Sequence, residues 1–476
     1  MHGESSAPRR RLGRHAIVIG GSVAGLAAAR VLADHFGAVT ILERDPRPQG
    51  PEPRKGAPQM RHVHALFFAA STGLEALFPG FIAELRAAGA LERDFANAYG
   101  MYQYGAWKPR FRAGFDVVAC SRPLIEWHIR RRVEALANVT VRHEHVADDL
   151  IADDLITDAK RRRVTGVRVR GPAGEETLAA DLVLDAGGRG SRAPRWLEAL
   201  GHGRPEEQSV GIDLAYVSAT FARVDDARRD WSGLVVTPRA PGRRGGFLLA
   251  VEGDRWLASM TGMFGDHCPT DAAGFLEFAR SLPVPDIHAA IEHATPLSAP
   301  VMHKIPSSRW LHFEKMATLP DGLVMLGDSV CALNPVYGQG ITVAIQCVRE
   351  LEAALVDLSR GTGDLRGLPP ALQRRLARVI APSWLLSTTM DLRYPEATGA
   401  RAPGLSAAQW LFASFLDMTT VDERACRLLF DLMHMRRGPA ALLRPGMLVP
   451  FLAYCARSPF VPLAGRIRQG PLPPAV

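Results

Sequence analysis

The sequence of 476 residues predicts an α/β fold in which a parallel sheet, assembled from separate parts of the chain, is combined with an inserted antiparallel sheet and a C-terminal helical segment. Apolar runs at 16–19, 182–184 and 323–326 each lead through a glycine-containing turn into a helical pattern, as strands buried in a parallel sheet do. Apolar and polar residues alternate along 211–224, which predicts strands with one covered face. Leu, Ala, Met and Trp are frequent from residue 381 onward, which indicates packed helices.

The first turn, GGSVAG at 20–25, lies between a predicted strand and a helix, and a second strand ends at Glu43. This order is typical of a dinucleotide site: Gly20 permits the tight turn, Gly25 lets the helix pack closely, and Glu43 is placed to hold ribose hydroxyls. Ser22 stands where the motif has its middle glycine. Its small side chain can point away from a phosphate or donate its hydroxyl to it, beside the N–H groups of the helix start. A turn that binds nothing is the alternative interpretation.

The stretch GLVMLGDSVCALNPVYGQGITVAIQ (322–346) predicts a buried strand, an irregular loop and a helix that begins near Gly340. Asp328 follows the strand and is placed to accept hydrogen bonds from the hydroxyls of a polyol. The helix start at Gly340 and Ile341 offers unpaired N–H groups and a positive dipole end, which stabilise negative charge on a reduced ring. The alternative is an Asp that caps a helix in a loop of structural role.

Composition excludes several classes of function. The net charge of +8 comes almost entirely from arginine, with no basic run interleaved with aromatics, so we expect no nucleic-acid partner. Six scattered cysteines without a C-x-x-C pair indicate a reducing compartment and predict a cytoplasmic protein. No run of about 18 uncharged apolar residues occurs, so we expect no stable membrane insertion.

These segments, in this order, resemble the FAD-dependent monooxygenases of the para-hydroxybenzoate hydroxylase type, over most of the chain to about residue 390. The resemblance implies a discontinuous Rossmann-like FAD-binding domain, an inserted antiparallel-sheet substrate domain, and O2 as co-substrate. Arg122 in ACSRPLIEWHIRRRVE matches a family arginine that reaches the FAD phosphate or ribityl region. The implied cofactor-binding residues are Gly20, Gly21, Ser22, Ala24, Gly25, Glu43, Arg44, Arg122, Asp328, Pro335, Gly338, Gly340 and Ile341.

The resemblance also implies a division of the chain into domains. The expected FAD-binding domain comprises 14–75, 120–205 and 305–380, the substrate domain 76–119 and 206–304, and the C-terminal helical region 381–476.

Three loops narrow the resemblance to bacterial epoxidases that oxidise the polyene precursors of polyethers, with squalene epoxidases as more distant relatives. They are GPEPRKGAPQMRHVHAL (50–66), DAGGRGSRAPRWLEALG (185–201) and GDSVCALNPVYGQG (327–340). One feature departs from the aromatic hydroxylases, which carry Ala-Asp-Gly where this chain has Ala186-Gly187-Gly188. That Asp is associated with FAD and NADPH binding, so we expect electrons from loosely bound NAD(P)H or from a separate flavin reductase.

The predicted function is insertion of one oxygen atom from O2 through a flavin C4a-hydroperoxide. Epoxidation or hydroxylation of a small lipophilic polyketide or terpenoid is expected. A geranylgeranyl-reductase-like enzyme and a non-catalytic FAD-fold carrier are the alternatives. A halogenase is disfavoured because no two tryptophans are two residues apart, so the W-x-W-x-I-P motif is missing.

The sequence singles out no catalytic side chain, because epoxidation of an alkene needs no base and the cofactor carries the hard step. A phenol hydroxylase benefits from a group that deprotonates its substrate. The candidates for that role are Tyr99, Tyr102, Tyr104 and His267. His62 and His64, two residues apart, are expected near the flavin or in packing, and no metal is predicted.

Overall fold

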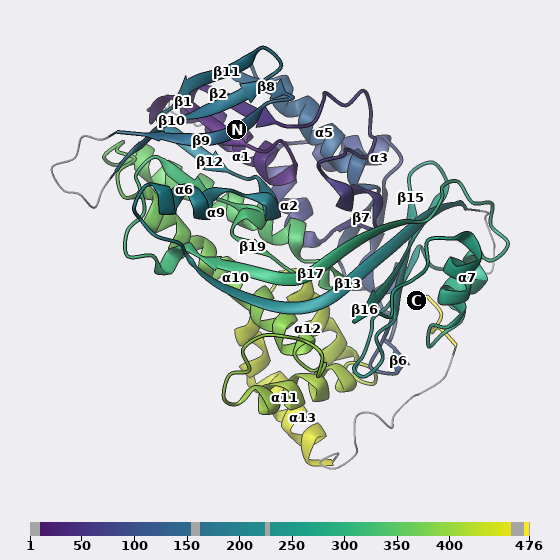
Figure 1. The fold of residues 1–476 in the computed structure, drawn as a ribbon. Coiled ribbons are helices and arrows are strands. Elements are labelled where there is room, and N and C mark those ends of the chain that lie inside the picture. Colours follow the sequence, from purple (N-terminus) through teal and green to yellow (C-terminus); the bar gives the residue numbers. More distant parts are fainter. Residues whose placement is uncertain (1–9, 154–161, 224–228, 458–470, 476) are drawn as a thin grey trace, which may run out of the picture.

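A computed structural model of the chain describes residues 10–153, 162–223, 229–457 and 471–475. Figure 1 shows an upper lobe built around the parallel sheet, a long ribbon of two strands that leaves it, and a lower group of C-terminal helices. The predicted fold class is confirmed by this arrangement.

The parallel sheet of the upper lobe brings together strands that are far apart in the sequence. Its order is β18 (Leu323–Met325), β12 (Leu182–Asp185), β1 (Gly13–Ile19), β2 (Phe36–Glu43) and β8 (Val139–His143). The helices α1 (Val23–Ala33) and α5 (Arg122–Glu134) contact its strands, α9 (Gly340–Arg360) packs against α1, and α6 (Ala193–Ala199) follows β12 in the chain. The predicted strand–turn–helix units are confirmed, and only two residues separate the end of α1 at Ala33 from the start of β2. Phe36 already begins β2 and is fully buried opposite Gly13.

The second large sheet has eight strands and carries the insertion. Its order is β19 (Cys331–Ala332), β17 (Val301–His312), β13 (Glu206–Ala222), β16 (Arg255–Met263), β15 (Gly245–Val251), β14 (Gly233–Val236), β5 (Tyr99–Gln103) and β6 (Ala106–Trp107). The pairs are antiparallel apart from β14 and β5, which are parallel. The long strands β13 and β17 pair along most of their length and connect the lobes (Figure 1).

Smaller elements complete the two lobes. Two three-stranded sheets consist of β3 (Ala65–Leu66), β7 (Asp116–Ala119) and β4 (Leu91–Asp94), and of β11 (Gly174–Ala179), β10 (Val164–Gly171) and β9 (Val146–Ala152). The remaining helices before residue 300 are α2 (Phe68–Leu77), α3 (Phe81–Ala87), α4 (Phe95–Ala98), α7 (Ala272–Arg280) and α8 (Asp286–Ile291).

The described C-terminal part is mainly helical up to Arg457, as predicted, and residues 458–470 and 476 of the predicted helical region lie outside the described residues. It comprises α10 (Leu368–Asp391), α11 (Leu405–Met418), α12 (Glu423–Met433) and α13 (Pro445–Arg457). Buried side chains of α11 and α12, such as Phe415 and Phe430, join Phe95 and Tyr99 in one apolar cluster that covers the end of the large sheet. Within the described residues, no helix combines the length and the apolar character needed to cross a membrane.

Candidate functional site

The turn between β1 and α1 brings backbone very close to backbone. Gly20 has a φ of +100°, and a Cβ there would lie 2.5 Å from the carbonyl oxygen of Ala186. A Cβ on Gly25 would lie 1.9 Å from the carbonyl oxygen of Gly20. The Ser22 side chain makes no capping hydrogen bond at the start of α1, where Ser22 and Val23 line a large cavity. The uncapped N–H groups therefore suit a phosphate group.

Ser22 has two hydrogen-bond partners on α5. Its hydroxyl donates to Glu126 Oε2 at 2.6 Å, and it accepts a hydrogen bond from Arg122 Nη2 at 3.1 Å. The serine that replaces the middle glycine thus connects the turn to α5. Burial alone would raise the pKa of Glu126, but Arg54, Arg122 and the Ser22 hydroxyl hold it below its usual value.

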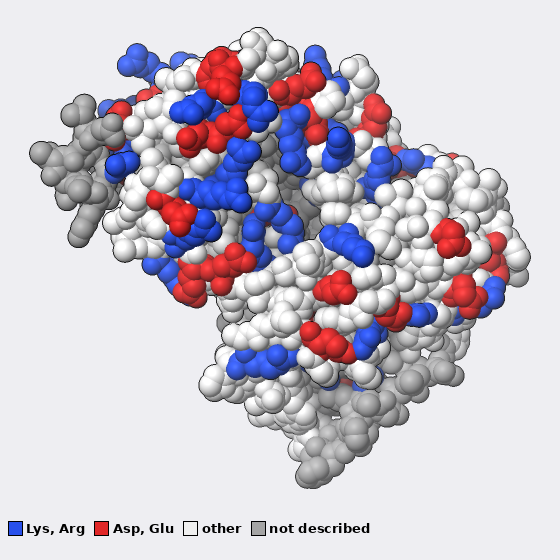
Figure 2. Space-filling view, in the orientation of Figure 1, with Lys and Arg blue, Asp and Glu red and all other residues white. Residues whose placement is uncertain are grey.

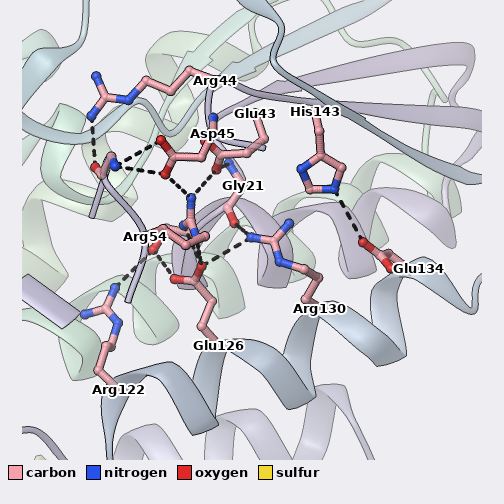
Figure 3. Close-up of polar contacts among 12 residues, drawn as sticks. Gly21, Glu43, Arg44, Asp45, Arg54, Arg122, Glu126, Arg130, Glu134 and His143 are labelled. Carbon is pink, nitrogen blue, oxygen red and sulfur yellow. Dashed lines mark hydrogen bonds and ion pairs between the residues drawn. The ribbon is translucent and has the colours of Figure 1, made fainter. Parts of the chain in front are cut away.

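Beside the turn, three carboxylates surround one arginine, and we call this group the Arg54 cluster (Figure 3). The Arg54 side chain is only 7% exposed. Its guanidinium lies 2.8 Å from Glu126 Oε1, 2.7 Å from Asp45 Oδ2 and 3.1 Å from Glu43 Oε2. Glu43 also accepts from the Gly21 N–H at 3.1 Å. The carboxylate predicted to hold ribose hydroxyls therefore also supports the turn.

Sequence reasoning missed three of the four members of this cluster, namely Arg54, Asp45 and Glu126. Arg54 lies in the 50–66 loop, which was noted only for its resemblance to the epoxidases. Glu126 is one helical turn beyond Arg122, so helical spacing places both on the same face of α5. That spacing was the available signal. Arg44 lines the cavity and donates to the Gly56 carbonyl oxygen at 2.9 Å.

The other predicted segment forms the wall opposite the turn. Gly327–Ser329 is a single 3₁₀ turn after β18, and a 3₁₀ turn at Pro335–Tyr337 precedes α9. Gly338 has a φ of +68°, and a Cβ on it would lie 2.9 Å from the Phe67 ring. The side chain of Gln339, which precedes α9, does not cap its start, and Gly340 has open space where its Cβ would stand. The predicted residues of this segment, Asp328, Pro335, Gly338, Gly340 and Ile341, all line the same cavity.

One cavity of about 780 Å³ connects these parts. Its nucleotide end is lined by the turn and by Arg44, Arg54, Arg122, Arg189 and Arg192. On the face shown in Figure 2, Lys and Arg side chains border a recess in the surface. The other end is mostly aromatic and apolar, with Arg239 and Arg393 beside the Tyr104 ring, and we call it the substrate end. It includes Tyr99, Met101, Tyr104, Tyr216, Phe247, Met390, Asp391, Phe412 and Leu416.

The candidate catalytic residues separate into two groups. Tyr99 and Tyr104 line the substrate end, whereas neither Tyr102 nor His267 is among the residues that line the cavity. The Tyr102 ring packs edge-on against Trp107, and His267 contacts the carbonyl oxygen of Asp213 at 3.0 Å. These contacts give Tyr102 and His267 structural roles.

His62 and His64 both line the cavity and are held by protein groups. His62 Nδ1 is 2.7 Å from the Ser218 hydroxyl, and burial lowers the pKa of His62 to about 4. His64 Nδ1 lies 2.9 Å from the carbonyl oxygen of His62, and its Nε2 lies 3.5 Å from Arg122 Nη1. Burial and the charge of Arg122 lower the pKa of His64 to about 3, so both rings are neutral at pH 7.

The Ala186-Gly187-Gly188 departure has a local explanation. Asp185 is fully buried at the end of β12 and accepts a hydrogen bond from the Gly187 N–H at 2.8 Å. A Cβ on Gly187 would lie 2.9 Å from Asp185 Oδ1. An acidic residue at 187 would place a second carboxylate against the first, which is unfavourable. Glycine at 187 therefore avoids both the close contact and the charge repulsion with the Asp185 carboxylate.

Two polar groups at the cavity test whether FAD suits this site. Arg122 Nε is buried and has no partner among the described residues. The Asp328 carboxylate faces the cavity without a hydrogen bond from the described part of the chain, and burial raises its pKa while Arg189 and Arg122 oppose that rise. A free guanidinium N–H suits a phosphate and a free carboxylate suits hydroxyl groups. With two uncapped helix starts, the residues present fit a dinucleotide that carries a polyol.

Comparison with known proteins finds a relative that aligns with most of this chain. No family model matches it. Protein Rv3254 of Mycobacterium tuberculosis (strain ATCC 25618 / H37Rv) is 33% identical over 421 residues, which cover 86% of each chain. The chain belongs to the family of Protein Rv3254.

Solved structures share the fold at low sequence identity. PqsL, a probable FAD-dependent monooxygenase from Pseudomonas aeruginosa, aligns with a TM-score of 0.59 and 18% identity over 80% of this chain and 97% of its own. The p-nitrophenol 4-monooxygenase PnpA from Pseudomonas putida DLL-E4 gives 0.62 and 15% over 90% and 100%. The flavin-dependent brominase Bmp2 gives 0.64 and 12% over 94% and 98%. The chain therefore has the fold of flavin-dependent monooxygenases and halogenases, whereas the likeness to polyether epoxidases stays a prediction.

Proposed function

We propose that this protein is an FAD-dependent monooxygenase that transfers one atom of O2 to a small organic substrate. The observation that carries this proposal is the continuous cavity between the glycine turn and the aromatic substrate end, with Asp328 and the start of α9 along its wall. A protein that only carried a dinucleotide would need no second, apolar compartment open to the same cavity.

FAD, once reduced, supplies the chemistry that activates O2. The chain supplies binding and surroundings. The turn with Ser22 and the N–H groups of Arg122 hold the pyrophosphate, Asp328 accepts hydrogen bonds from the ribityl hydroxyls, and the positive end of α9 stabilises negative charge on the reduced ring. The aromatic substrate end excludes water and positions the substrate.

We further propose that the reaction is epoxidation or hydroxylation of a largely apolar polyketide or terpenoid. Its electrons come from NAD(P)H, directly or through a separate flavin reductase. The lining of the substrate end by Tyr99, Met101, Phe247, Phe412 and Leu416 supports an apolar substrate. The absence of tryptophans two residues apart supports oxygen transfer over halogenation. In PqsL, the same fold binds the small molecule 2-aminobenzoylacetate.

Purification followed by an oxygen-electrode assay tests the proposal. We expect a yellow protein that holds FAD and that consumes O2 when it is reduced with NAD(P)H, alone or with a flavin reductase. A colourless protein that cannot be reconstituted with FAD would overturn the proposal. Turnover that proceeds without oxygen would instead indicate a reductase of isoprenoid double bonds.

A further inference from the structure

Asp391, at the last position of α10, is a buried carboxylate in the wall of the substrate end. It is 1% exposed and lines the cavity. Its Oδ1 accepts hydrogen bonds from Asn334 Nδ2 at 2.9 Å and from the Tyr337 hydroxyl at 2.8 Å. Both donors lie in the loop that leads to α9. Asp391 is therefore fixed at the junction between the proposed flavin site and the substrate end.

The second oxygen of this carboxylate has no protein partner. Asp391 Oδ2 is buried without a hydrogen bond among the described residues. Besides His62 and Arg122, three other side chains that line the cavity have a buried polar atom without a partner among the described residues, and we call these three and Asp391 the substrate-end polar set. The three are Tyr99, Gln103 and Tyr216. Buried polar groups in folded proteins are almost always hydrogen-bonded, so four such groups around one cavity indicate that a ligand completes them.

We propose that Asp391 recognises a hydroxyl group of the substrate, by accepting a hydrogen bond from it at Oδ2. This inference rests on the proposed function and narrows its substrate class. The substrate is a largely apolar molecule that bears a phenolic or enolic hydroxyl, and a plain polyene hydrocarbon would leave Oδ2 unpaired. Phenols and enols are also electron-rich, as electrophilic oxygen transfer requires.

The surroundings of Asp391 agree with this role. Burial raises its pKa to about 7, against the two hydrogen bonds from Tyr337 and Asn334. Asp391 interacts electrostatically with the phenols of Tyr216, Tyr337 and Tyr394. Burial and the charge of Asp391 raise the pKa values of these phenols, so all three are neutral at pH 7. The adjacent Arg393 donates to the Tyr104 hydroxyl at 2.9 Å. Asp391 thus changes from acid to carboxylate near neutral pH.

A matched pair of probes tests the proposal: 2-naphthol and its methyl ether, 2-methoxynaphthalene, which differ in the hydroxyl proton. Naphthol, like a tyrosine side chain, stays protonated near neutral pH. Binding to the FAD-loaded protein is measured by equilibrium dialysis at pH 6 and pH 8. We expect wild type at pH 8 to prefer naphthol by about tenfold or more, as for a buried hydrogen bond to a charged group. The preference should be smaller at pH 6, where protonated Asp391 can donate to the ether oxygen.

The variant Asp391→Asn keeps an oxygen that accepts from Asn334 and Tyr337, so the loop stays tied, but it removes the charge. We expect its preference for naphthol to fall to about one and to lose its pH dependence. Glu396→Gln is the matched control, because Glu396 pairs with Arg243 outside the cavity and should leave the preference unchanged. An Asp391→Asn protein that keeps the wild-type preference would overturn the inference, as would a wild-type preference that does not change with pH.

The FAD content of each preparation separates this inference from the proposed function. Loss of FAD from wild type would count against the flavin site itself. A fully loaded wild type that does not distinguish the two probes would count against Asp391 alone.

Discussion

The two ends of the cavity differ in whether their buried polar side chains have hydrogen-bond partners within the protein. At the nucleotide end, the three carboxylates of the Arg54 cluster are paired with arginines and with the turn, and Arg122 Nε, a cationic N–H, is buried without a partner among the described residues. At the substrate end, the substrate-end polar set leaves hydroxyl, amide and carboxylate oxygens without partners. The first end is built for an anion before any ligand arrives, and the second is completed by its ligand.

The largest effect is expected where the nucleotide end leaves no space. Gly25→Ala places a Cβ 1.9 Å from the carbonyl oxygen of Gly20, and the backbone must move to accept it. We expect the free energy of unfolding to fall by about 3 kcal/mol or more, measured by chemical denaturation. Gly50→Ala is the control, since nothing lies within 4 Å of its added Cβ. Equal stability of the two variants would show that the turn is not closely packed.

Two substitutions of Ser22 test separately the effects of side-chain size and of side-chain polarity at the same turn. Ser22→Leu should abolish FAD binding, because a bulky side chain at the start of α1 fills the space of the phosphate. Ser22→Gly should keep FAD and lose about 1 kcal/mol of stability with the hydrogen bonds to Glu126 and Arg122. FAD content after purification and thermal melting measure both effects. Retention of FAD by the leucine variant would show that the turn does not approach the phosphate.

Arg122 tests the cationic group of the nucleotide end. Arg122→Ala should weaken FAD binding by about 10- to 100-fold, as for the loss of hydrogen bonds to a charged group. Arg131→Ala on the exposed face of the same helix should leave the affinity unchanged. Fluorescence titration of the apoprotein with FAD measures the difference. Indistinguishable affinities would remove Arg122 from the cofactor site.

The last prediction concerns the pH dependence of stability at the substrate end without any ligand. The pKa of Asp391 is raised from 3.8 to about 7 in the folded protein, so folding favours its protonated form. The stability that this provides is complete below pH 4 and is lost as the pH rises through 7. Asp391→Asn should therefore gain stability relative to wild type as the pH rises from about 4 to 7, by up to about 4 kcal/mol. Buried histidines act in the opposite direction, but the difference between the two proteins cancels them. A difference that is flat with pH would contradict the raised pKa.

The contrast between the ends also explains what could be predicted from the sequence. Gly20, Gly25 and Glu43 lie in one continuous strand–helix–strand unit, so local spacing is sufficient to find them. The wall around Asp328 and Gly340 is similarly continuous. The prediction of Arg122 depended on the family resemblance, because the helix that carries it is distant in sequence from the turn.

The residues of the substrate end could not be predicted from local sequence spacing. Asp391 carries no motif, and its meaning depends on the loop at 334–340 reaching the end of α10 in three dimensions. Tyr99 and Tyr216 come from strands that only the folded sheet brings together. Among four candidate residues, burial and cavity lining were needed to separate Tyr99 and Tyr104 from Tyr102 and His267.

Titration of the purified protein with FAD tests most directly whether the cavity is a flavin site. Bound FAD is followed by its absorbance after removal of free cofactor, with the Arg131→Ala protein as a control for general handling. We predict saturable binding of one FAD per chain by wild type and by this control. A folded wild-type protein that neither carries FAD nor takes it up would contradict the assignment of the turn, of Asp328 and of the start of α9 to one cofactor.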